Sequence, residues 1–128
     1  MNKQKFMINF LNAFFRLFQA HINKIKFEKD HVIGSIIWND TKELQEFSWI
    51  FSSDIYNYEN TIQLIDFLIH HKLIEGDKIV ISKIALINIL KKFNWDLKKI
   101  EDSISFLCSI RIPMIDDAEI SDYFFIHF

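Results

Sequence analysis

Near the start of the chain, a phenylalanine recurs at every fourth position. The repeat comprises Phe6, Phe10, Phe14 and Phe18, and it is widened by Met7, Leu11 and Phe15. Because an α-helix turns once every 3.6 residues, this spacing places the rings on one broad face. A bulky apolar face of this width needs other residues to cover it. The segment therefore predicts a helix that docks against the core of a domain.

The same segment has two other interpretations. Basic residues before an apolar stretch are typical of a signal peptide, and an amphipathic helix can also lie on a membrane surface. However, Asn9, Asn12 and Arg16 interrupt the apolar run, no small-residue cleavage site follows, and the run is too short to span a membrane. We therefore expect residues 1–29 to form a basic amphipathic helix with a structural role, and we expect no membrane span.

The composition indicates one folded domain over residues 1–128. Half of the residues are hydrophobic and 25% are charged, which excludes intrinsic disorder. Only two glycines are present, too few for the glycine-rich loops that cradle phosphates. The single cysteine, Cys108, has no internal disulfide partner, so a cytoplasmic location is expected. Ile, Lys, Phe and Asn are abundant and have A/T-rich codons, which favours a bacterial source.

Further along the chain, the apolar spacing predicts both helices and strands. Residues 31–38 are apolar and β-branched, as in a buried strand. Asp40 and Glu43 have the spacing of a capping pair and predict a helix that continues through residue 51, although this segment can also pair as a strand. A loop over residues 54–60, a helix over 61–74 and a strand over 78–81 follow.

Two helix starts are marked by capping residues. Ser82 predicts a helix that ends near Phe93, and Asp96 predicts a second helix that ends at Cys108. The last 20 residues are typical of two strands around an acidic turn. The predicted fold class is a helix-rich α+β domain with a small, mostly antiparallel sheet.

From residue 61 to residue 128 the predicted order is helix, strand, helix, tight turn, helix and hairpin. This order resembles the winged-helix arrangement, in which residues 96–108 correspond to the recognition helix and residues 115–122 to the wing tip. Binding of duplex DNA depends on Lys and Arg that neutralise phosphates. The tip instead carries four acids and no basic residue, so we expect no specific binding of duplex DNA.

The acidic turn is the main candidate for a functional site. Its carboxylates suit a basic protein partner, and the tyrosine that follows them can anchor such a contact. Aspartate is also common in solvated turns, because it hydrogen-bonds to local backbone, so a bare turn is the alternative. The predicted partner-binding residues are Asp116, Asp117, Glu119, Asp122 and Tyr123, together with Glu101 and Asp102 from the preceding helix.

Catalytic and metal motifs are missing from the sequence. Asp116, Asp117 and Glu119 with His127 match neither a calcium-binding loop nor the His-Glu-x-x-His spacing of zinc enzymes. His70 and His71 are adjacent on a predicted helix and point about 100° apart, which does not suit a shared metal. We expect Cys108 to be a buried, inert thiol. No enzymatic activity, cofactor or metal is therefore expected.

Charge asymmetry completes the functional interpretation. Residues 1–29 hold six Lys/Arg and one acid, a net charge of +5, whereas residues 30–128 carry −7. Small size, an acidic body and no catalytic constellation favour an immunity- or antitoxin-type protein that inhibits a basic, nuclease-like toxin by binding it. A phage-type inhibitor of a host nuclease is physically almost the same hypothesis, and the sequence does not separate the two. The alternative is a winged-helix nucleic-acid-binding regulator that contacts phosphates through its basic N-terminal segment.

Overall fold

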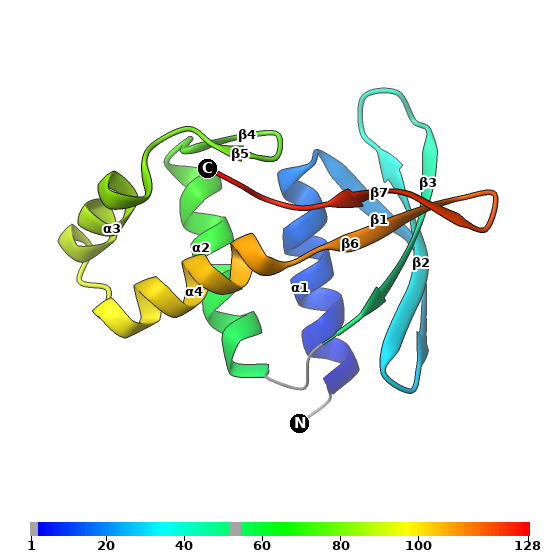
Figure 1. Ribbon diagram of the computed structural model, residues 1–128, viewed down its shortest axis with the longest axis horizontal. Helices are drawn as coiled ribbons and strands as arrows, with labels where there is room; N and C mark the ends of the chain where they lie inside the picture. The colour runs from blue at the N-terminus through cyan, green and yellow to red at the C-terminus, as the bar shows by residue number, and fades with distance from the viewer. Residues whose placement is uncertain (1–2, 52–54) are drawn as a thin grey trace.

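The computed structural model describes residues 3–51 and 55–128, and these residues form helices and two antiparallel sheets (Figure 1). The helices are α1 (Lys3–Leu17), α2 (Ile55–His70), α3 (Lys83–Lys92) and α4 (Leu97–Ser109). The larger sheet consists of β1 (Ala20–Glu28), β2 (His31–Trp38), β3 (Leu44–Ile50), β6 (Ile112–Asp116) and β7 (Glu119–Phe124). The smaller sheet pairs β4 (Ile74–Glu75) with β5 (Lys78–Ile79). The chain is an α+β domain, but its five-stranded sheet is not small relative to the helices.

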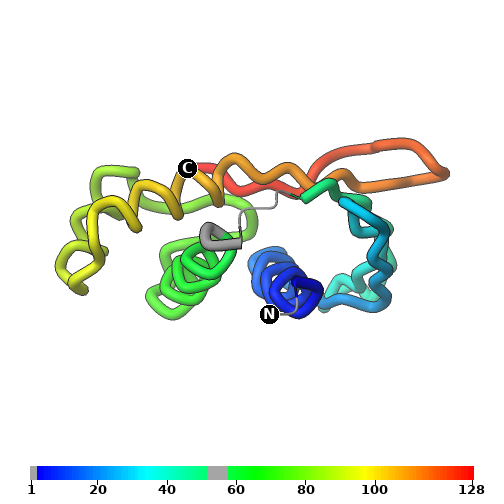
Figure 2. The backbone as a smooth tube through the Cα atoms, turned by 90° about the horizontal axis from the view of Figure 1, so that it is seen from below, coloured from blue at the N-terminus to red at the C-terminus, as the bar shows by residue number. Residues whose placement is uncertain are grey.

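The strand order of the larger sheet is β1-β2-β3-β6-β7, and every neighbouring pair is antiparallel. Figure 2 shows that β1, β2 and β3 curl around α1, with α2 beside it. The pairing of Phe47 with Met114 joins β3 to β6 across a long stretch of sequence. The C-terminal hairpin therefore completes a sheet that the N-terminal segments begin.

One glycine allows the sheet to curl tightly. The β1–β2 register shifts between Ile22 and Lys24, and such a bulge increases local twist. Gly34 pairs with Ile25, close to this shift. A Cβ atom at residue 34 would lie 2.4 Å from the carbonyl oxygen of Lys24 and 3.0 Å from Cζ of Phe47. Only glycine fits between the β1 backbone and the Phe47 ring without displacing them.

Helix α1 is at the centre of the core. Phe10 and Phe14 are fully buried, which confirms the predicted docking face. The ring centroid of Phe10 lies 5.7 Å from that of Trp49 on β3, 4.9 Å from Tyr58 on α2 and 6.2 Å from Phe106 on α4. Since one side chain contacts the sheet and two further helices, the helices and the sheet share a single core.

The predicted helix over residues 1–29 is wrong beyond Leu17. After α1 the chain reverses through Gln19, whose φ is 57°, and continues as strand β1. Residues 20–28 pair with β2 along their length, which satisfies their backbone groups in a ladder. The basic residues of the segment are therefore divided between a helix, an edge strand and, for Lys29, the turn that follows the strand. Residues 1 and 2 lie outside the described residues.

The helix predicted to start at Asp40 is also wrong, and its strand alternative is confirmed. Asp40 Oδ1 accepts a hydrogen bond from the Thr41 amide at 2.7 Å, and Thr41 Oγ1 accepts one from the Glu43 amide at 3.3 Å. These bonds stabilise the β2–β3 turn instead of a helix start. Phe47 and Trp49 then alternate into the core as β3 side chains.

The remaining boundaries are partly as predicted. Strand 31–38 and both capping residues are confirmed: Ser82 Oγ accepts from the Ala85 amide at 3.1 Å, and Asp96 Oδ2 accepts from the Lys99 amide at 3.4 Å. Helix α2 covers residues 55–70, so the predicted loop over 54–60 is helical from residue 55, and Asp54 lies outside the described residues. The predicted strand 78–81 shortens to β5, which covers Lys78–Ile79.

Among the helices of residues 3–51 and 55–128, none combines the length and the hydropathy that a membrane span requires.

Candidate functional site

The acidic turn is the tip of the β6–β7 hairpin, which extends beyond the rest of the sheet (Figure 1). Its central residues, Asp117 and Ala118, have φ values of 52° and 65°. Two consecutive left-handed residues are typical of the tight two-residue turn whose twist matches that of a hairpin. Neither residue is glycine, so the turn adopts this conformation at some cost in backbone energy.

The structure brings the four predicted turn acids together at this tip, and all four are exposed. Asp116 Oδ1 accepts a hydrogen bond of 3.1 Å from Gln45 Nε2, and Asp122 Oδ1 accepts one of 2.8 Å from the Tyr123 amide. Within the described residues, none of the four acids forms an ion pair with Lys, Arg or His. Their negative charge is therefore not compensated by the fold itself.

Strand β3 supplies site residues that the sequence reasoning missed. A hollow of about 540 Å³ at the base of the turn is lined by Leu44, Glu46, Ile115, Asp116, Asp117 and Ala118. Glu46 adds a fifth exposed carboxylate, and Leu44 adds an apolar side chain that is 56% exposed. Gln45 Nε2 also donates to the Ile115 carbonyl at 3.2 Å and so fixes the hairpin to β3. The sequence signal that indicates a strand here is the alternation of polar Glu46 and Ser48 with apolar Phe47 and Trp49.

Exposed apolar side chains lie on the outer face of the sheet near the turn. Ile120 is 56% exposed and pairs across the hairpin with Ile115, which in turn pairs with Glu46 on β3. Tyr123 is 42% exposed and pairs with Pro113. A solvated face of an antiparallel sheet usually carries polar side chains. Exposed apolar groups beside a charged turn are instead typical of an interaction surface.

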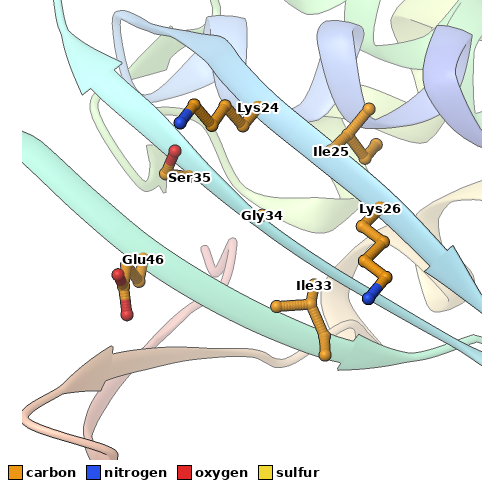
Figure 3. A pocket seen from close by; sticks show the side chains of 7 residues that line it. All are labelled: Lys24, Ile25, Lys26, Ile33, Gly34, Ser35 and Glu46. Carbon is orange, nitrogen blue, oxygen red and sulfur yellow. The ribbon is translucent and has the colours of Figure 1, made fainter.

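The outer face becomes basic toward β1. Figure 3 shows a second hollow of about 550 Å³, where Lys24 and Lys26 extend from β1 over the sheet and Glu46 extends from β3. Ser35 accepts a hydrogen bond of 3.1 Å from the Asn23 side chain beside this hollow. The sheet thus carries positive charge at one edge and negative charge at the other.

The structure does not bring Glu101 and Asp102 to the turn. Both belong to α4, which lies on the helical side of the molecule, whereas the hairpin tip lies at the far end of the sheet (Figures 1 and 2). Asp102 Oδ2 accepts a hydrogen bond of 3.0 Å from Lys98 Nζ. The bond to Asp102 raises the pKa of Lys98, because it stabilises the charged ammonium.

The histidines and the single cysteine are the other side chains that the sequence analysis considered as reactive groups. No group of three or more His, Cys, Asp or Glu side chains suited to a metal ion occurs in the described part of the chain. His71 packs its ring 4.2 Å from that of Phe67, while His70 is exposed. Cys108 is half-buried, and burial raises the pKa of its thiol despite the opposing charges of Lys83 and Arg111. A raised pKa disfavours the nucleophilic thiolate.

Comparison with models of protein families, with curated proteins and with solved structures finds no match to this chain.

Proposed function

We propose that the protein acts by binding a basic protein partner, with the acidic turn at the centre of the contact. The observation that carries this proposal is the group of four exposed, unpaired carboxylates at the projecting tip of the hairpin. Uncompensated charge of one sign attracts a partner of opposite sign and accelerates its association.

The apolar neighbours of the turn support a protein partner in particular. Stable interfaces combine an apolar, desolvated centre with a charged rim. Leu44, Ile120 and Tyr123 supply exposed apolar surface next to the carboxylates, and tyrosine is favoured among residues that dominate binding energy. A metal ion or a small anion would gain nothing from these side chains.

In its more specific form, the proposal is an immunity- or antitoxin-type inhibitor in the bacterial cytoplasm that neutralises a nuclease-like toxin. A nuclease binds the phosphates of its substrate with Lys and Arg side chains. Carboxylates at Asp116, Asp117, Glu119 and Asp122 can occupy those cationic positions and block the substrate. The chain would then need no catalytic group of its own.

The test is a binding measurement between this protein and the toxin-like product of the neighbouring gene. The variant replaces the four turn acids with Asn or Gln, with circular dichroism to verify its fold. We expect the association rate constant to fall by about tenfold or more at low salt, and the difference to shrink at high salt, because electrostatic steering is screened.

A matched control tests whether the loss in association rate arises from the turn acids or from the change in net charge. Glu101→Gln with Asp102→Asn removes two carboxylates from α4, away from the turn, and we expect it to leave the association rate nearly unchanged. Full affinity and full protection from the toxin in the four-acid variant would refute the acidic turn as the binding surface. An equal loss in the control would show that net charge, and not the turn, determines binding.

The element order supports a second candidate, the winged-helix nucleic-acid-binding regulator. From α2 to β7 the order of elements agrees with that arrangement. The pairing differs, because β6–β7 joins β3 in the larger sheet, whereas β5 contacts the C-terminal segment through one parallel bridge between Lys78 and His127. Sequence-selective binding of duplex DNA at physiological salt would favour this candidate over the inhibitor.

A further inference from the structure

The end of the molecule opposite the acidic turn carries a concentrated positive charge. It is formed by the α3–α4 connection, which Figures 1 and 2 both place at the far end from the β6–β7 tip. Residues 91–99 contain four lysines and one acid, a net charge of +3 in a chain whose total is −2. We call residues 91–99 the basic connection.

A tight turn brings the lysines together from two helices. Asn94 has a φ of 65°, and the Trp95 amide donates to the Leu90 carbonyl at 3.1 Å. The end of α3 is therefore joined to the start of α4 by this short turn. Lys91 and Lys92 are exposed and have no ion-pair partner within the described residues, so their charges face solvent.

Phe93, which follows Lys91 and Lys92 directly in the chain, holds an aromatic ring at the surface. Phe93 is 54% exposed, an unusual state for so large an apolar side chain. Its ring centroid lies 5.2 Å from that of Phe67 on α2 and 5.0 Å from that of His71. These contacts orient the Phe93 ring before any ligand binds, which lowers the entropic cost of binding.

A second ring continues this surface. Trp95 is half-buried, and its ring lies 6.1 Å from that of Phe67. Lys99 Nζ stands 4.2 Å above the Trp95 ring and also donates to the Gln63 side chain. The one acid of the basic connection, Asp96, is used to cap α4. The surface thus combines oriented aromatic rings with Lys91 and Lys92, whose charges face solvent.

We propose that the basic connection binds single-stranded nucleic acid, with an unpaired base on the Phe93 ring and adjacent phosphates on Lys91 and Lys92. Aromatic rings stack on any unpaired base, and lysines attract the backbone between bases, so this combination is typical of sequence-independent single-strand binding. It differs from the winged-helix reading, because the proposed contacts come from Lys91, Lys92 and Phe93 at the end of α3, and not from the hairpin tip or from residues 96–108. It also does not depend on the acidic turn.

Single strands fit this surface better than a duplex does. Bases in a duplex are stacked on each other and not available to Phe93. Beyond Lys99, helix α4 presents the exposed carboxylate of Glu101, which would repel the second strand. With two or three phosphate contacts, we expect weak binding that falls by about tenfold between about 50 and 200 mM salt.

The test uses fluorescence anisotropy with a labelled oligothymidylate and a duplex of equal length. Lys91→Gln with Lys92→Gln should flatten the salt dependence by about 1.4 logarithmic units per decade of salt, the value for two lost phosphate contacts. Phe93→Leu should weaken binding by about fivefold or more through loss of stacking, whereas Phe93→Tyr should retain it. Circular dichroism melting verifies that each variant is folded.

Lys24→Gln with Lys26→Gln is the matched control, because it removes two exposed lysines from β1. An equal loss of binding in this control would overturn the proposal in favour of nonspecific charge. Equal affinity for the duplex, or no saturable binding of the oligothymidylate, would also overturn it. Binding to phosphatidylglycerol vesicles that depends on Phe93, without binding of the oligonucleotide, would assign the surface to lipid instead.

Discussion

At the scale of single residues, Gly34 is the position with the least tolerance for substitution. We expect Gly34→Ala to lower the free energy of unfolding by about 1–3 kcal/mol, because the new methyl group would overlap the Lys24 carbonyl oxygen at 2.4 Å. Urea titration monitored by tryptophan fluorescence measures this loss. Gly76→Ala is the control, because nothing lies within 4 Å of its added Cβ and only its φ of 60° opposes the change. A smaller loss at residue 34 than at residue 76 would contradict the close packing of β1 on β2.

Cys108 gives a prediction about chemical reactivity. Burial raises the pKa of its thiol, so at any pH below that value a smaller fraction is thiolate than in a free cysteine. Because the thiolate is the nucleophile, iodoacetamide should modify folded Cys108 more slowly than free cysteine at pH 8. The modification rate should approach that of free cysteine in denaturing urea. An unusually fast reaction in the folded protein would indicate an activated thiol instead.

At the scale of elements, α1 determines the stability of the domain. Phe10→Ala should cost about 3–5 kcal/mol, since it removes a fully buried ring that contacts three other elements. Phe6→Ala should cost less, because Phe6 is only half-buried. Thermal melting followed by circular dichroism compares the two variants. Unchanged melting of Phe10→Ala, together with partition of the wild-type protein into vesicles, would instead support a membrane-surface helix.

Elements were predictable where local chemistry determines them. Ser82 and Asp96 were identified as helix caps because a cap needs only a side-chain oxygen and an amide three residues later. The sequence predicts a helix for the residues of β1, and a helix with a strand as the alternative for those of β3, since the sequence of a strand does not reveal its pairing partner. Residues 44, 47 and 51 have helical spacing, while residues 47 and 49 have strand spacing, and only the ladder with β2 selects the strand.

At the scale of the whole molecule, the site was predictable in part. The exposed position of the turn acids followed from turn chemistry, and the structure places these acids at a hairpin tip. The distance of Glu101 and Asp102 from the turn, and the closeness of Leu44 and Glu46 to it, depend on how α4 and β3 are placed. Such placement results from long-range packing, which spacing along the sequence does not encode.

The shared core also predicts that the C-terminal part of the chain does not fold on its own. A fragment of residues 55–128 contains α2, α3, α4 and the C-terminal hairpin, but it lacks α1 and the β3 partner of that hairpin. We therefore expect it to lose cooperative unfolding in urea, whereas the full chain should give coincident transitions by fluorescence and circular dichroism. A cooperative transition in the fragment would show that this half is an independent domain.

The packing of the C-terminal hairpin against the N-terminal aromatic side chains has a consequence for synthesis of the protein on the ribosome. Phe15 and Phe18 on the N-terminal side of the fold pack their rings 5.1 Å and 5.2 Å from Phe124. These aromatic side chains have no cover from the hairpin until residues 112–124 have been translated. During elongation the nascent chain therefore exposes aromatic, aggregation-prone surface. We expect chaperones that recognise such surface to bind the nascent chain before the hairpin has been translated.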